Sequence, residues 1–147
     1  MRLGSIAVIA VTLLLAGFDL VAGDAHAEGA VAIGIARGGV VQGYAIGISI
    51  DHPSKSAAQK DAMDRCRSSQ GSNKPAQQNC KLVGTAINQC VASALDPKDG
   101  TPGAGWAVAD TQAAADDAAL AGCRNTAGAA RRDFCKVMNR RCDGSAK

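Results

Sequence analysis

Aromatic residues make up only 3% of this chain of 147 residues, and histidine, glutamate and long apolar runs are also scarce. So few aromatic side chains argue against a base-stacking platform for nucleic acid. The longest uncharged apolar run, residues 6–16, would span about 16 Å as a helix, roughly half of a bilayer core, which argues against stable membrane insertion. The length, with 47% hydrophobic and 20% charged residues, is typical of one folded domain.

The N-terminus has the pattern of a secretory signal. Arg2 precedes the apolar run, and a polar stretch then ends in Ala25-His26-Ala27, an A-x-A cleavage pattern. We expect residues 1–27 to be removed as a signal peptide and residues 28–147 to form a single disulfide-rich domain, secreted or periplasmic, that begins at Glu28. No cysteine precedes Cys66, so no thiol near the cleavage point is available to carry a lipid.

The cysteines predict disulfide crosslinks. An even number of cysteines in an exported chain favours disulfides, and the six lie beyond the expected signal: Cys66, Cys80, Cys90, Cys123, Cys135 and Cys142. Zinc is the alternative, but no C-x-x-C pair occurs and His52 is the only histidine after the signal. We therefore expect no metal and no cofactor.

The sequence repeats itself. Residues 54–66 recur in pattern at 111–123, Gly43-Tyr44-Ala45-Ile46 resembles residues 105–108, and residues 80–83 resemble 135–138, which defines halves of about 29–89 and 90–142. Six cysteines allow fifteen connectivities. The repeat favours bridges Cys66–Cys80 and Cys123–Cys135 within the halves and Cys90–Cys142 between them.

Each half reads as strand, strand, helix, strand. Ser54 and Thr111 can cap helices in which small apolar residues recur every three to four positions. Strands are expected at residues 30–36, 40–49, 82–87, 91–95, 105–109 and 136–140. The pattern predicts an α+β fold in which two β-β-α-β units form an antiparallel or mixed sheet with two helices on one face.

Each half contains a Gly-aromatic-Ala strand, an alanine-rich helix that ends in cysteine, and a strand that begins with Cys-Lys. This repeated pattern resembles a bacterial exported family, domain of unknown function 4189. The resemblance covers most of residues 29–142 and is carried by residues 43–45, 57–58, 62, 66, 80–83, 90, 105–107, 114–115, 118–120 and 123. It implies the fold and export. The family carries no established activity that would transfer.

No catalytic constellation is evident. His52 precedes Pro53 at a helix entrance, where a solvated loop residue is expected, and Asp116-Asp117 suits the positive end of a helix dipole. Residues 103–105 and 96–100 read as turns because they lack the spacing of a nucleotide loop or a calcium loop. We expect a protein that is not an enzyme. The alternative is an envelope hydrolase that uses His52 or an aspartate such as Asp117.

The C-terminal segment is the electropositive stretch of the sequence, which is typical of a solvated basic face or of a surface for an acidic partner. Residues 124–147 contain seven basic and two acidic side chains, whereas the chain after the signal carries 15 and 11 in all. We expect a binding module whose partner is a macromolecule, either a protein or an acidic envelope component, with no nucleic acid bound. A secreted effector or an inhibitor of a foreign enzyme is a further alternative, and an unpaired edge strand would allow a homodimer. The candidate binding residues are Tyr44, Trp106, Arg131, Arg132, Arg140 and Arg141.

Overall fold

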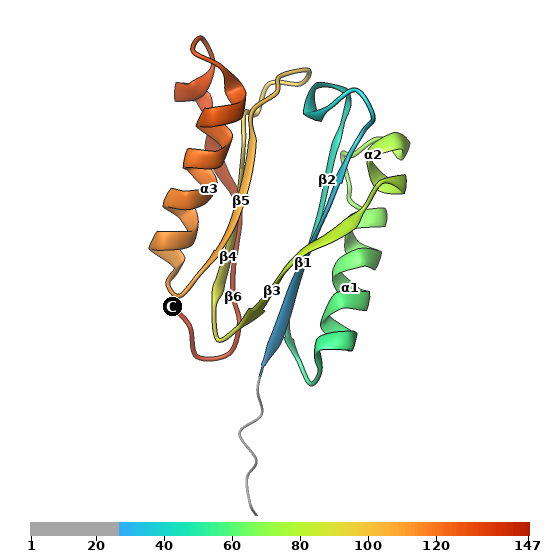
Figure 1. Cartoon of the computed structure of the whole chain (residues 1–147), viewed down its shortest axis with the longest axis vertical. Coiled ribbons are helices and arrows are strands. Elements are labelled where there is room, and N and C mark those ends of the chain that lie inside the picture. Colours follow the sequence, from blue (N-terminus) through green and yellow to red (C-terminus); the bar gives the residue numbers. More distant parts are fainter. Residues whose placement is uncertain (1–26) are drawn as a thin grey trace, which may run out of the picture.

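The computed structural model describes residues 27–147, so the expected signal peptide lies outside the described residues except for Ala27. The chain forms two similar units, one after the other in sequence (Figure 1). The first contains β1 (Glu28–Ile35), the 3-10 turn η1 (Val40–Gln42), β2 (Tyr44–His52), α1 (Lys55–Arg67), α2 (Lys74–Gln78) and β3 (Lys81–Ile87). The second contains β4 (Cys90–Leu95), β5 (Ala104–Ala109), α3 (Gln112–Ala127), the 3-10 turn η2 (Arg132–Phe134) and β6 (Lys136–Cys142).

Each unit has its own antiparallel sheet of three strands. The strand orders are β2-β1-β3 and β5-β4-β6, so the first strand of each unit lies in the centre. The last strand of each unit carries a bulge at the same point, because Val83 and Met138 are the residues skipped in the two registers. This shared irregularity supports the repeat that the sequence indicates at residues 80–83 and 135–138.

The helices begin where the hydroxyl residues predict. Ser54 Oγ accepts a hydrogen bond from the N–H of Ala57, and Thr111 Oγ1 accepts one from the N–H of Ala114. Small residues on the inner helix faces allow close approach to the sheets. The approach is closest at one glycine in each unit: a Cβ on Gly47 would lie 2.0 Å from Ala62 O, and a Cβ on Gly105 would lie 2.2 Å from Ala119 O.

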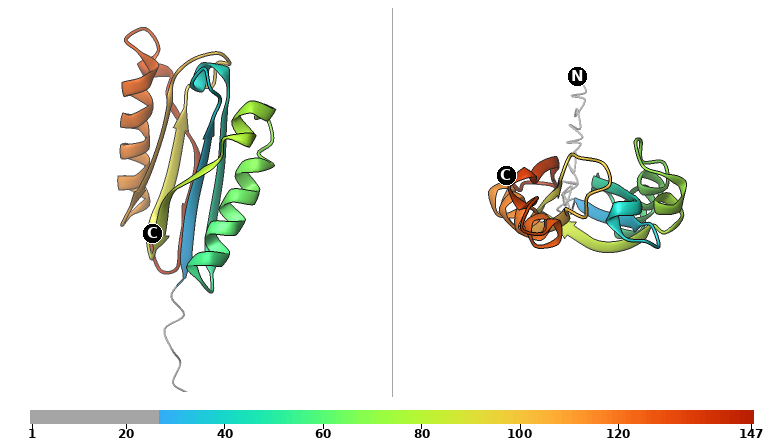
Figure 2. Two further views of the ribbon diagram at one scale, coloured as in Figure 1. Left: turned by 45° about the vertical axis from the view of Figure 1, so that its right-hand side comes forward. Right: turned by 90° about the horizontal axis from the view of Figure 1, so that it is seen from above.

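The four layers run helix, sheet, sheet, helix (Figures 1 and 2). On β1, Ala30 and Ala32 pack against α1, whereas Val31 and Ile33 point toward the second sheet and join Ala86 and Val91 in a core between the sheets. In the second unit α3 covers the outer face of β4 and β5 in the same way. Small side chains thus lie under the helices and larger ones lie between the sheets.

The α+β class and the two β-β-α-β units are confirmed. The arrangement of layers differs from the expected single sheet with both helices on one face, because there are two sheets and each has its helix on the outer side. The physical reason is that the central strands are apolar on both faces. A single sheet with helices on one side would leave Val31, Ile33 and Val91 exposed to water.

All three disulfides lie within a unit: one is in the first unit and two are in the second. The structure joins Cys66 to Cys80, Cys123 to Cys135 and Cys90 to Cys142, the pairs that the repeat favours. The expectation that the Cys90–Cys142 bridge joins the halves is wrong, because the two cysteines lie opposite each other on β4 and β6 of the second sheet. The halves are instead held together by the core between the sheets and by a polar contact at the end of β6.

That polar contact is made by the buried Asp143. Its carboxylate accepts hydrogen bonds from the backbone N–H of Asp51 (2.6 Å) and of Asn88 (3.3 Å). Both residues have positive φ, 60° and 51°, which is uncommon for residues other than glycine. The carboxylate therefore fixes the end of β2 and the turn between β3 and β4 against the C-terminal segment.

The structure also corrects one part of the repeat. Gly47, and not Gly43, takes the place that Gly105 takes under its helix, since both glycines contact the equivalent helix residues. Tyr44 is therefore not the structural counterpart of Trp106. The helix α2, with Asn73 as its cap, was not expected from the sequence, because it spans only five residues in the loop between α1 and β3.

Candidate functional site

An apolar hollow lies where the edge strands β3 and β5 face each other. This β3–β5 hollow, of about 420 Å³, is lined by Ile33, Ile35, Asn79, Lys81, Val83 and Trp106. Three of its apolar side chains are well exposed: Ile35 at 43%, Val83 at 38% and Trp106 at 37%. Clustered exposed apolar side chains are typical of interaction surfaces, whereas isolated ones are ordinary.

The wall of the hollow is built by close packing between the units. The indole of Trp106 lies over Gly84 of β3, because a Cβ on Gly84 would be 3.4 Å from Trp106 Cζ3. The Asn79 side chain is fixed by donating to Ile35 O at 3.0 Å. Among the described residues, no carboxylate lies within ion-pair distance of the Lys81 ammonium, so the rim of the hollow carries a positive charge.

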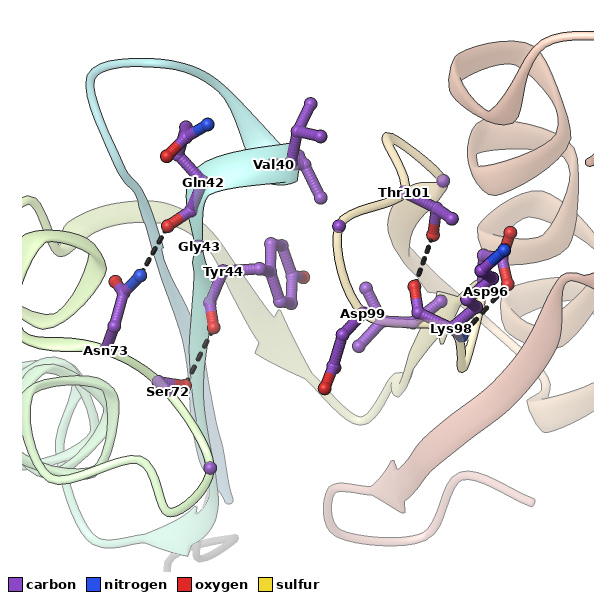
Figure 3. Close-up of a pocket in the computed structure, with 15 residues that line it drawn as sticks. Val40, Gln42, Gly43, Tyr44, Ser72, Asn73, Asp96, Lys98, Asp99 and Thr101 are labelled. Carbon is purple, nitrogen blue, oxygen red and sulfur yellow. Dashed lines mark hydrogen bonds between the residues drawn. The ribbon is translucent and has the colours of Figure 1, made fainter.

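A second cavity, of about 340 Å³, lies between three loops at the end of the sheets (Figure 3). Its lining includes the segments 40–44, 71–73 and 95–103. Three polar side chains in its wall fix the loops: Ser72 Oγ donates to Tyr44 O at 2.7 Å, Thr101 Oγ1 donates to Lys98 O at 2.7 Å, and Asn73 donates to Gln42 O. This loop cavity is therefore held open by hydrogen bonds within its own walls.

Tyr44 points from β2 toward the loop that contains Lys98 and Asp99 (Figure 3). Its hydroxyl is buried and has no hydrogen-bond partner among the described residues. Burial raises the pKa of this phenol above its ordinary value, so the group stays neutral. Tyr44 and Trp106 approach the space between the sheets from opposite edges, because β2 and β3 flank β1 and Trp106 lies against β3.

The four arginines proposed as a basic surface are dispersed. Arg140 points toward α3 and pairs with Asp116 at 2.8 Å, while Arg141, on the opposite face of β6, lines a shallow hollow with Arg65 and the β2 residues Ile46 and Ile48. Arg132 lies beside the C-terminal end of α3. Strand alternation thus places Arg140 and Arg141 on opposite faces of β6, while Arg132 and Trp106 line two other hollows.

Arg131 is held by a carboxylate. Its guanidinium makes two hydrogen bonds to Asp96, at 2.7 and 2.6 Å, and lies 4.0 Å from the centre of the Phe134 ring. The hydrogen bonds from Arg131 lower the pKa of Asp96 to about 2. This fork geometry ties η2 to the end of β4, and it uses donors that would otherwise be available to a partner.

The hydrolase alternative gains no compact site from the structure. His52 is not a solvated loop residue: it ends β2, and its Nε2 lies 3.1 Å from Asp61 Oδ2, which also accepts from Arg65 Nε at 2.7 Å. Asp117 is exposed on α3, which covers the other outer face of the molecule (Figure 1). The two residues proposed for hydrolysis therefore lie in different units, His52 at the end of a strand of the first and Asp117 on the helix of the second.

Metal-binding clusters and membrane-spanning helices are both absent from residues 27–147. In that range no cluster of three or more His, Cys, Asp or Glu side chains has an arrangement that would hold a metal ion. No helix in the same range combines the length and apolar character needed to cross a membrane.

The site that the geometry favours was visible in the sequence only through Trp106. Ile35, Val83, Lys81 and Asn79 were not proposed as binding residues, because their neighbourhood depends on how the two sheets face each other. A sequence signal did exist, since Leu82 and Val83 are consecutive apolar residues on a strand that proves to be an edge.

Comparison with known proteins gives the family and no function. No curated protein and no solved structure matches the chain. The model of one family matches residues 29–142, which is most of the sequence, and it agrees with the resemblance carried by the repeated motifs. The chain belongs to the family described as domain of unknown function DUF4189.

Proposed function

We propose that this protein is an exported, non-catalytic binding module that holds an apolar, acidic segment of another extracytoplasmic protein in the β3–β5 hollow. The observation that carries the proposal is the exposed indole of Trp106 among Ile35 and Val83, on a wall that the opposite sheet holds in place. Tryptophan is enriched among the residues that dominate binding energy, because it buries a large area at small entropic cost.

The positive charge at the rim of the β3–β5 hollow indicates the chemistry of the partner. Lys81 carries the exposed cation beside the apolar lining, so a carboxylate next to an apolar side chain is the complementary partner chemistry. A protein segment supplies both groups within a few residues. We therefore favour a protein over an acidic polymer without apolar groups.

We also propose that the protein is exported from the cytosol. Six cysteines in three disulfides are typical of oxidising compartments, and the apolar run at residues 6–16 with Ala25-His26-Ala27 is typical of a signal peptide. We propose cleavage between Ala27 and Glu28. An intact-mass measurement on protein recovered outside the cytosol should give a chain that begins at Glu28 and lacks six hydrogens relative to the reduced form.

The repeat offers matched controls for a test of binding. Lys136 and Met138 occupy in β6 the positions that Lys81 and Val83 occupy in β3, and both are exposed. Purified protein would be immobilised and used to capture partners from envelope extract, with Trp106→Ala and Lys81→Glu compared with Met138→Ala and Lys136→Glu.

We expect a captured protein that is lost with the first two variants and retained with the two controls. Truncation of a central tryptophan typically costs 2 kcal/mol or more, which is a loss in affinity of about 30-fold. A partner retained equally by all four variants would place binding elsewhere on the molecule. Capture of nothing above background by the oxidised protein would count against a binding role altogether.

A further inference from the structure

The edge of β5 beside the hollow has backbone groups that β4 does not use. Asp96 N donates to Gly103 O at 3.0 Å, which makes these two residues a hydrogen-bonded pair. Hydrogen-bonded and non-hydrogen-bonded pairs alternate along an antiparallel ladder, and the β4–β5 register has no shift. The N–H and C=O of Ala104, Trp106 and Val108 therefore point away from β4.

One of these three residues is already capped. Thr126 Oγ1 of α3 accepts from Ala104 N and donates to Ala104 O, both at 2.9 Å. These contacts verify independently that the backbone of Ala104 faces outward. No backbone or side-chain partner within residues 27–147 is recorded for the N–H or C=O of Trp106 and Val108.

The free edge and the hollow share one residue. The side chain of Trp106 lines the β3–β5 hollow, while its backbone belongs to the free edge. In a strand added to β5, every second side chain would project to the face of the sheet that carries Trp106, and so into the hollow. The other side chains would project to the face that α3 covers.

We propose that the partner segment binds as an added β-strand, paired with the N–H and C=O groups of Trp106 and Val108, with one apolar side chain in the hollow and a carboxylate at Lys81. This inference rests on the proposed function and specifies how the segment is held. Main-chain hydrogen bonds would supply affinity, and the hollow would select alternate side chains.

Proline at position 108 tests this pairing selectively. Val108→Pro removes an N–H that points away from β4, so the β4–β5 ladder keeps its hydrogen bonds, and proline is tolerated on edge strands. Val108→Ala is the matched control, because it shortens the side chain and keeps the N–H. Circular dichroism and intact mass would verify the fold and the three disulfides in each variant.

The probe is a blocked eight-residue peptide in which valine alternates with threonine and one central position is glutamate. A twin carries N-methyl groups on the amides of one edge, which prevents strand pairing on that side. Trp106 is the only tryptophan of the chain, so its fluorescence reports binding at the hollow directly. We expect saturable binding to the wild type and to Val108→Ala, and binding about tenfold weaker or more for Val108→Pro and for the methylated twin.

Equal binding of the peptide and its methylated twin, or equal binding to the proline and alanine variants, would overturn strand addition. Absence of binding to the wild type would also overturn it. In each case a capture that still depends on Trp106 would leave the binding module intact. A wild-type dimer that Val108→Pro converts to a monomer in light scattering would assign the edge to a second copy of this chain and contradict the proposal.

Discussion

Replacement of Gly47 by alanine should destabilise the fold strongly, although alanine is smaller than almost any other side chain. The added Cβ would lie 2.0 Å from Ala62 O and 2.4 Å from Cys66 N, both backbone atoms of α1. An ordinary contact is about 3.4 Å or more, so the helix would have to retreat by more than 1 Å and would open the layer of small residues beneath it. Overpacking of this kind typically costs 1–3 kcal/mol.

Gly84 of the same sheet is the matched control. Its nearest neighbour to an added Cβ is Trp106 Cζ3 at 3.4 Å, an ordinary contact, and its φ is not in the left-handed region. Gly84→Ala should be neutral or stabilise by about 0.4–1 kcal/mol, because alanine restricts the unfolded chain. Denaturant unfolding of the oxidised proteins measures both free energies. Equal stability of the two variants would refute the close contact between α1 and β2.

Three further predictions concern buried polar groups and the crosslinks. Tyr44→Phe removes an unpartnered buried hydroxyl and should leave the free energy of unfolding unchanged or raise it by up to about 1 kcal/mol, whereas a loss above 1 kcal/mol would reveal a missed partner. Hydrogen bonds from Arg131 lower the pKa of Asp96 from 3.8 to about 2, so the stabilisation from the ionised carboxylate is complete above pH 3.8 and is lost as the pH falls through 2. Arg131→Ala should raise the pKa of Asp96 measured by NMR titration, and an unchanged pKa would contradict the ion pair. Loss of the Cys90–Cys142 bridge, whose cysteines are 52 residues apart, should lower the free energy of unfolding by about 4 kcal/mol. Loss of the Cys123–Cys135 bridge, whose cysteines are 12 residues apart, should lower it by about 3 kcal/mol, and the reverse order in chemical denaturation would refute the chain-entropy argument.

Local features of the fold followed from the sequence. The hydroxyls of Ser54 and Thr111 mark the helix starts, because few other residues satisfy the free N–H groups of a first turn. The repeat also favoured the three cysteine pairs that the structure joins. Such signals depend on neighbours in sequence or on a constant offset, which are visible without coordinates.

The packing of the layers did not follow, although its signal was present. On β1 small and large apolar residues alternate, Ala30 and Ala32 against Val31 and Ile33, and this alternation separates a face for a helix from a face for a second sheet. An apolar strand buried on both faces does not by itself say what covers each face. The choice between one broad sheet and two facing sheets depends on the whole molecule.

The candidate site shows the same division. Trp106 was identified from its rarity, but its neighbours Ile35 and Val83 come from the other sheet and are 71 and 23 residues distant in sequence. Arg131 was expected to be free for a partner, whereas Asp96, which lies 35 residues away, holds it. Contacts between the ends of different strands are fixed by tertiary packing, and no local pattern reports them.

The most direct test of the central claim is site-specific photo-crosslinking in the native compartment. A photoreactive side chain at Val83 would lie in the β3–β5 hollow, and the same side chain at Met138 would occupy the equivalent bulge of the other sheet. We expect one discrete adduct from position 83, diminished by Lys81→Glu, and no such adduct from position 138. The same adduct from both positions, or adducts only from position 138, would contradict the claim.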